Sequence, residues 1–200
     1  MQNYFGFEKE FFVTDKYGKL IVVPKELPMD SCGFLVEARS VPCGGSFESV
    51  HMLMAECDRI KIKATKAGVK LLDVSGAKVS NQLKREALAL VGNKEVHQDI
   101  MSVYGDKIRY PNTPTAGLHI HFGKTEEFYN DGELICTRCP HIDHVPIIMF
   151  MDDFFEEEIR SSKRQNGIYR FMPYGFEYRS LPCNVDLMKV ASALSDMDAE

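Results

Sequence analysis

Pairs of ionisable residues recur two positions apart in four segments of this sequence that are otherwise rich in apolar residues. Successive side chains of a β-strand point to opposite faces, so two residues at this spacing lie on one face. The pairs are Glu8 with Glu10, Glu37 with Arg39, His119 with His121, and Glu177 with Arg179. Carboxylates bind Mg²⁺ and Mn²⁺, and arginine binds phosphate or carboxylate through paired donors. If the four segments pair in one sheet, the shared face would form a site for a divalent metal and an anion.

Each pair also has a simpler interpretation when it is taken alone. Glu8 and Glu10 could form an exposed polar face, and the two Glu-x-Arg pairs could be ordinary ion pairs, which contribute little when exposed. Two histidines on one face of an apolar strand are harder to explain in this way, because glycines on both sides allow close approach of the backbone. The four pairs together favour a metal and anion site.

Strands and helices must hold these segments together. Alternation predicts strands over residues 3–14, 34–40 and 116–123 and from Gly167 onward, with shorter strands at 20–23 and 69–74. Apolar spacing of three and four predicts helices over 46–68, 80–91, 146–160 and 185–193, with Ser46 as an N-cap and Pro146 in a first turn. Residues 92–115 are poorly periodic, and residues 124–139 have only weak turn character. This order, without regular βαβ alternation, predicts a single α+β domain over residues 1–200, with helices on one face of a mostly antiparallel sheet.

Composition narrows the class of protein. The net charge of −5 over 200 residues provides no basic field that would attract nucleic acid. The longest apolar stretch, residues 145–151, is far shorter than the roughly 20 residues that a membrane helix needs, and no signal peptide is visible. We therefore expect a cytoplasmic protein without membrane or nucleic-acid partners, whose six cysteines are reduced.

In their order, the four motifs resemble the phage carboxylate–amine ligase (amidoligase) family of the glutamine synthetase-like superfamily. The segments are GFEKEFF (6–12), GFLVEAR (33–39), AGLHIHFG (116–123) and YGFEYRSLP (174–182). The resemblance spans nearly the whole chain and depends on the ordered set. It implies a fold like the glutamine synthetase catalytic domain, in which a curved antiparallel sheet holds ATP and two or more Mg²⁺ or Mn²⁺ ions. It also implies a phage-encoded protein of the host cytoplasm.

The resemblance implies a role for each motif residue. The metal ligands would be Glu8, Glu10, Glu37, His119 and Glu177. His121 would contact metal or nucleotide phosphate, Arg179 would stabilise the transferred phosphate, and Arg39 would assist catalysis. Arg164 and Arg170 match basic positions that contact phosphate or a substrate carboxylate. In the implied reaction, a carboxylate attacks the γ-phosphate of ATP, and an amine on a small molecule or peptide then displaces phosphate from the acyl phosphate.

Two other functions stay open at this point. The same residues could serve a metal-dependent hydrolase of phosphate or amide bonds, or a non-catalytic phage protein that retains the scaffold. The chain has no equivalent of the N-terminal domain of glutamine synthetase, and no segment identifies an adenine pocket. A second acid near the middle strand would be Asp30, and Asp152 could face the site from an apolar run.

Two further motifs are weaker. Cys136, Cys139, His141 and His144 are too closely spaced for a typical zinc site, so a loop with reduced thiols is favoured, although Cys183 could serve as a distant ligand. The GKT sequence at 123–125 is not the end of a P-loop, because five residues rather than four separate Gly117 from Gly123. An alternating strand fits that segment better.

Overall fold

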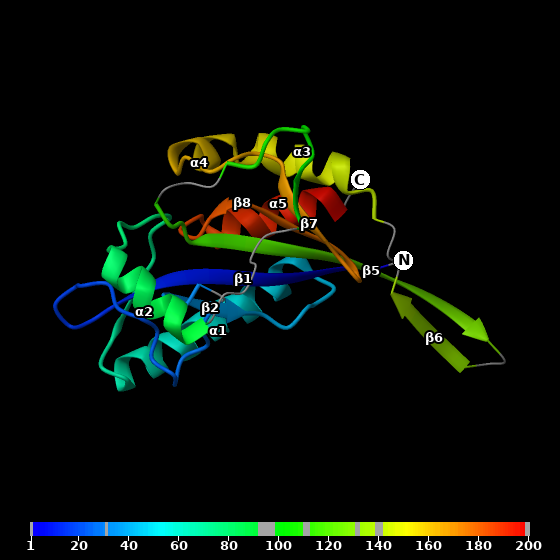
Figure 1. Cartoon of the computed structure of the whole chain (residues 1–200). Coiled ribbons are helices and arrows are strands. Elements are labelled where there is room, and N and C mark those ends of the chain that lie inside the picture. The colour runs from blue at the N-terminus through cyan, green and yellow to red at the C-terminus, as the bar shows by residue number, and fades with distance from the viewer. Residues whose placement is uncertain are drawn as a thin grey trace.

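The chain folds into an α+β structure with a mostly antiparallel open sheet and, among the described residues, five helices (Figure 1). The computed structural model describes residues 2–30, 32–91, 99–109, 113–130, 133–138 and 142–198. The strands are β1 (Gln2–Thr14), β2 (Leu35–Arg39), β3 (Lys70–Leu72), β4 (Ile100–Ser102), β5 (Gly117–Asn130), β6 (Glu133–Arg138), β7 (Ile168–Met172) and β8 (Gly175–Pro182). The helices are α1 (Ser46–Lys66), α2 (Asn81–Val91), α3 (His144–Phe154), α4 (Glu156–Ser161) and α5 (Leu187–Asp198).

The strand order brings segments that are far apart in the sequence next to one another. The main path of the sheet is β2-β1-β5-β8-β7-β4, while β3 pairs with β1 and β6 pairs with β5. The four strands that carry the ionisable pairs are therefore consecutive neighbours, from β2 at one end of the main path to β8.

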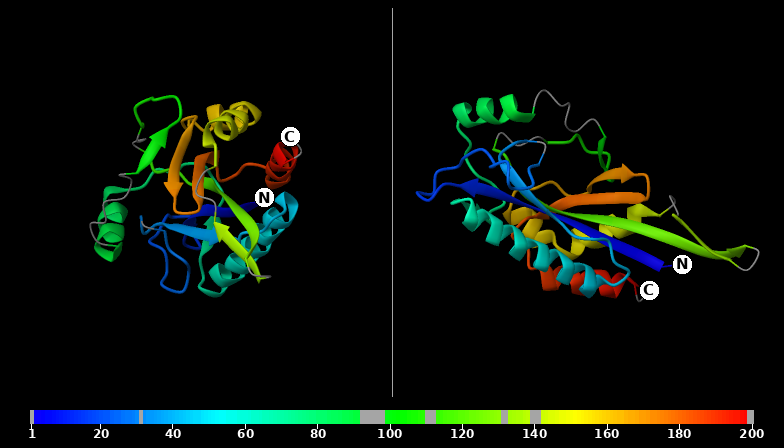
Figure 2. Two further views of the ribbon diagram at one scale, coloured as in Figure 1. Left: turned by 90° about the vertical axis from the view of Figure 1, so that its right-hand side faces the viewer. Right: turned by 90° about the horizontal axis from the view of Figure 1, so that it is seen from below.

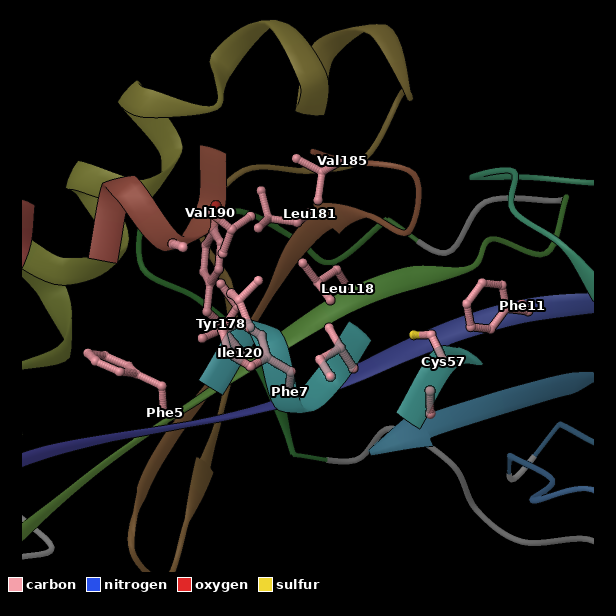
Figure 3. Close-up of a cluster of buried hydrophobic side chains, with 14 of the residues drawn as sticks. Phe5, Phe7, Phe11, Cys57, Leu118, Ile120, Tyr178, Leu181, Val185 and Val190 are labelled. Atoms are coloured by element: carbon pink, nitrogen blue, oxygen red, sulfur yellow. The ribbon is translucent and has the colours of Figure 1, made fainter. Parts of the chain in front are cut away.

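One face of the sheet is apolar and is covered by four helices. The odd-numbered residues Phe5, Phe7 and Phe11 of β1 are buried on this face, where they pack with side chains of α1, α3, α4 and α5. Figure 3 shows this core, in which Tyr178 and Val190 lie above Ile120 and Phe7. Burial of these side chains holds the strands in the register that aligns the opposite face.

The expectation that all helices lie on one face is wrong for α2. This helix lies on the other side of the strands from α1 and α5 (Figure 2), and its Ala87 packs in a second cluster with Phe12 and Phe34. The reason lies in β1, whose even-numbered residues lie on the face opposite the main core. This face is polar at Glu10 and apolar at Phe12. The apolar end of that face needs a cover, and α2 provides it.

Most predicted elements are present, with differences at their ends. Residues 124–139 have only weak turn character in the sequence, whereas in the structure β5 continues to Asn130 and pairs with β6 in a hairpin. Phe128, Tyr129, Leu134 and Ile135 are strand formers, which outweigh the turn residues between them. The short strand β4 lies in the poorly periodic segment. The expected strand at 20–23 is reduced to a single bridge between Leu20 and Thr14.

The predicted helix starts also need correction. Ser46 is the first residue of α1 and not its cap, because Gly45 holds the N-cap position without a side-chain hydrogen bond. Asp143 caps α3, its Oδ1 accepting a hydrogen bond from Val145 N, so Pro146 is the third helical residue. The expected helix 146–160 is divided at Phe155 into α3 and α4. Among the helices of the described ranges, none has the length and hydropathy to cross a membrane.

Candidate functional site

The four ionisable pairs meet on the face of the sheet opposite the main core. Glu8 lies opposite Arg39 of β2 on one side and opposite His119 of β5 on the other. Glu10 lies opposite Glu37. Farther along the sheet, His121 pairs with Glu177 of β8, which in turn pairs with Arg170 of β7. The two-residue spacing and the strand order together assemble these side chains in one cluster.

Three of these residues are arranged as ligands of one metal ion. Glu8, His121 and Glu177 each offer a ligand atom, and the three atoms lie within 4.8 Å of one another. His121 Nε2 is 3.3 Å from Glu8 Oε1, and Glu177 is fully buried. One imidazole and two carboxylates suit Mn²⁺, and the carboxylates suit Mg²⁺. The resemblance implied His119 as a metal ligand and a contact of His121 with metal or nucleotide phosphate; the geometry brings His121 into this group of three.

His119 lies deeper, among three carboxylates. Its Nδ1 is 3.1 Å from Glu177 Oε1 and 3.6 Å from Glu8 Oε2, and its Nε2 is 4.0 Å from Glu10 Oε2. Burial and the charge of Arg179 lower the pKa of His119, but Glu10, Glu177 and Glu8 together raise it above the ordinary value. The surrounding carboxylates therefore favour the protonated form of His119.

The carboxylates of the site differ in charge state. Burial alone would raise the pKa of Glu8 and of Glu177. The nearby imidazole of His119, and for Glu8 also that of His121, instead lowers the pKa of Glu8 below its usual range and that of Glu177 to about 2. Glu8 and Glu177 are therefore ionised over the physiological range, as metal ligands must be.

Two further carboxylates hold protons more tightly. Burial raises the pKa of Glu37 to about 7, even though Arg39 binds both of its oxygens at 2.8 and 3.1 Å. Burial also raises the pKa of Glu10, whose Oε2 accepts a hydrogen bond of 2.6 Å from Gly117 N. Their predicted roles as metal ligands remain predictions, since they lie outside the group of three that the geometry brings together.

Three arginines border the cluster. Arg179 and Arg170 both pair with Glu177, Arg170 Nη2 at 2.6 Å from Oε2. Arg39 pairs with Glu37 and lies 3.4 Å from Glu8, while 68% of its side chain is exposed. A guanidinium has five N–H donors, so each arginine keeps donors for an added anion. Their predicted contacts with phosphate remain predictions.

Arg164 has a different environment. Its guanidinium donates to three backbone carbonyls, those of Ser180 at 3.1 Å, Ala116 at 3.3 Å and Arg179 at 2.7 Å. Burial lowers the pKa of this guanidinium. These hydrogen bonds connect the start of β5 to β8, so Arg164 has a structural role. The phosphate contact that the resemblance implies for Arg164 remains a prediction.

Two buried ring nitrogens in the cluster show where a cation would fit. Among the described residues, His119 Nδ1 and His121 Nε2 have no hydrogen-bond partner, although carboxylate oxygens lie nearby. Buried polar atoms are rarely left without partners, and such exceptions are common at binding sites. The donor set and these two nitrogens fit a divalent metal ion.

A cavity opens beside the three candidate ligands. It has a volume of about 370 Å³, which lies within the range of small-molecule sites. Glu8 and His121 form part of its lining, and Tyr4, Pro42, Lys124 and Tyr174 form much of the rest. None of these last four residues is among the site residues predicted from the sequence. For Tyr174 a signal was available, because it begins the segment 174–182; Lys124 follows the strand of the two histidines.

The remaining sequence candidates lie outside the cluster or at its border. Asp152 does not face the site, which corrects the expectation: its Oδ1 accepts a 2.7 Å hydrogen bond from Tyr178 on the helix-covered face. The charge of Asp30 contributes to the raised pKa values of Glu10 and Arg39, so Asp30 lies within electrostatic reach.

The possible zinc cluster cannot be assembled from the described residues. Cys139 and His141 lie outside them, as does the side chain of Cys136. His144 packs against the rings of Tyr169 and Phe171. Cys183 is a buried free thiol in the second apolar cluster.

In comparisons with known proteins, the sequence matches no protein-family model and no curated protein. The function must therefore be argued from the site itself.

Proposed function

We propose that the protein is an ATP-dependent carboxylate–amine ligase with a fold like the glutamine synthetase catalytic domain. The observation that carries the proposal is the group of Glu8, His121 and Glu177, whose ligand atoms lie within 4.8 Å of one another beside a 370 Å³ cavity and several arginines. The order of the four motifs, which resembles the amidoligase family, supports the choice of reaction. We further propose that the protein is phage-encoded and acts in the host cytoplasm.

The charges around the cavity support a polyphosphate ligand. Glu8 and Glu177 would hold Mg²⁺ or Mn²⁺, which would offset the charge of the phosphates when bound. Arg170 and Arg179 border the same carboxylate, and Arg39 and Lys124 line the cavity. Four cationic side chains near one metal position favour a ligand with several negative charges.

The proposed reaction has two steps. A carboxylate oxygen of the first substrate attacks the γ-phosphorus of ATP, the bond to the β,γ-bridging oxygen breaks, and ADP leaves. An amine of the second substrate then attacks the acyl carbon of the acyl phosphate, loses a proton, and expels inorganic phosphate. The arginines would stabilise the charge of the transferred phosphoryl group, and the rigid strands would hold it in place.

Release of ADP and formation of an amide test the proposal directly. Pairs of carboxylates and amines would be screened with Mg·ATP, and the products identified by mass spectrometry. We expect ADP release that requires both substrates and a product that has lost one water. Release of phosphate without an amine would instead indicate a hydrolase, and absence of ATP binding would refute the proposal.

A matched pair of variants links the activity to the site. Glu177→Gln is expected to abolish Mg-dependent ATP binding while the fold is retained. Glu158→Gln makes the same chemical change on α4, where Glu158 pairs with Lys189 away from the cluster. This control variant is expected to bind Mg·ATP as the native protein does. Equal binding by both variants would show that the site is wrongly assigned.

A further inference from the structure

The phenol of Tyr174 contacts the imidazole of His121, the histidine in the candidate metal-binding group of Glu8, His121 and Glu177. Tyr174 lies in the turn between β7 and β8, and its Oη is 2.6 Å from His121 Nδ1. The other ring nitrogen, Nε2, is buried, makes no hydrogen bond among the described residues, and lies 3.3 Å from Glu8 Oε1. His121 is thus held on one side and left free on the side that faces the candidate metal position.

The turn itself is fixed against the sheet. Gly175 has a φ of +150°, and a Cβ at this position would lie 2.1 Å from the backbone oxygen of Phe122 on β5. A side chain at 175 would push β8 away from β5, so the position requires glycine. The residue before this close approach, Tyr174, lines the cavity together with His121.

Only one tautomer of a neutral imidazole leaves Nε2 able to bind a metal. The hydrogen must be on Nδ1, so that Nε2 carries the lone pair. A tyrosine oxygen at 2.6 Å from Nδ1 can accept that hydrogen. Metal-binding histidines usually have their second nitrogen held by an acceptor in this way, which fixes both the tautomer and the ring orientation.

We infer that Tyr174 is a positioning residue, which accepts a hydrogen bond from His121 Nδ1–H and so directs the unprotonated Nε2 toward Glu8 and Glu177. The inference rests on the proposed metal site. It also separates the two histidines: both ring nitrogens of His119 face carboxylates, whereas only one nitrogen of His121 does. His121 then serves as the ligand, and His119 as a charge partner.

Two measurements test this role. Nitrogen-15 NMR of the native protein loaded with Zn²⁺, a diamagnetic ion that also binds imidazole, reports which nitrogen of His121 carries the hydrogen, and we expect Nδ1. Titration with Mn²⁺ alone measures affinity without any turnover. In Tyr174→Phe, which keeps the ring, we expect about tenfold to hundredfold weaker Mn²⁺ binding and loss of the single tautomer.

Tyr169→Phe is the matched control, since it removes a phenol oxygen from β7 on the helix-covered face. It should leave both measurements unchanged. A hydrogen on Nε2 in the native protein would overturn the inference, as would Mn²⁺ affinity of Tyr174→Phe within twofold of native. If the native protein did not bind Mn²⁺, the proposed function would fail, whereas Mn²⁺ binding that Tyr174→Phe leaves unchanged would overturn the inference alone. The same native spectrum decides it if Tyr174→Phe fails to fold.

Discussion

Replacing Glu177 by Gln should lower the stability of the metal-free protein by an amount that depends on pH. Glu177 is fully buried, and its pKa falls from 4.5 to about 2. At 1.36 kcal/mol for each pKa unit, the folded state favours the ionised carboxylate by about 3 kcal/mol. A lowered pKa contributes stability above pH 4.5 that is lost as the pH falls toward 2, so about half should remain at pH 3. The loss in Glu177→Gln should therefore be about 3 kcal/mol at pH 7.

Urea unfolding of native protein and variant, with a chelator present, measures this difference at both pH values. The variant should remain folded, because 3 kcal/mol is less than the usual stability of a domain. Glu158→Gln is the control, and because its ion pair with Lys189 is partly exposed, it should cost at most about 1 kcal/mol. A loss for Glu177→Gln that is equal at pH 7 and pH 3 would refute the charge state assigned to Glu177.

Three other changes probe the site and the turn beside it. Mn²⁺ affinity should increase from pH 6 to pH 8, because Glu37, with a pKa of about 7, must release its proton near a bound cation. Calorimetry measures this affinity, and the Glu37→Gln variant should show less pH dependence than the native protein. Lys124→Met should weaken ATP binding and leave Mn²⁺ binding intact, because Lys124 lines the cavity. Lys84→Met, on the exposed side of α2, should change neither affinity. Equal ATP affinity in both variants would exclude Lys124 from the nucleotide site. Gly175→Ala should lower the melting temperature more than Gly18→Ala does. Both glycines have positive φ, but of these two positions only at 175 would the added Cβ meet a backbone atom. Equal decreases in melting temperature would contradict the close approach of Gly175 to Phe122.

Much of the sheet could be predicted from side-chain alternation. The even-numbered acids of β1 oppose a face of phenylalanines, so burial of one face fixes the direction of the other. The β5–β6 hairpin was missed because its sequence mixes acids and turn residues with strand formers, and pairing between strands decided the outcome. The position of α2 depended on Phe12, a single apolar residue at the end of a polar face.

The detailed geometry of the site was less accessible from the sequence. Alternation places His119 and His121 on one face, but it does not say which ring nitrogen meets which carboxylate. That depends on the register of β5 against β1 and β8 and on a turn that Gly175 brings close to Phe122. Arg164 likewise matches a position that contacts phosphate or carboxylate in the resemblance, and the sequence does not show that its guanidinium donates to three backbone carbonyls.

Anomalous scattering from a crystal grown with Mn²⁺ tests the central claim most directly. We expect a peak at bonding distance from a carboxylate oxygen of Glu8, from His121 Nε2 and from a carboxylate oxygen of Glu177, and we expect this peak to be missing in Glu177→Gln. A peak bound by other residues, or no peak in crystals of the native protein at millimolar Mn²⁺, would contradict the assignment of these three side chains as the metal site.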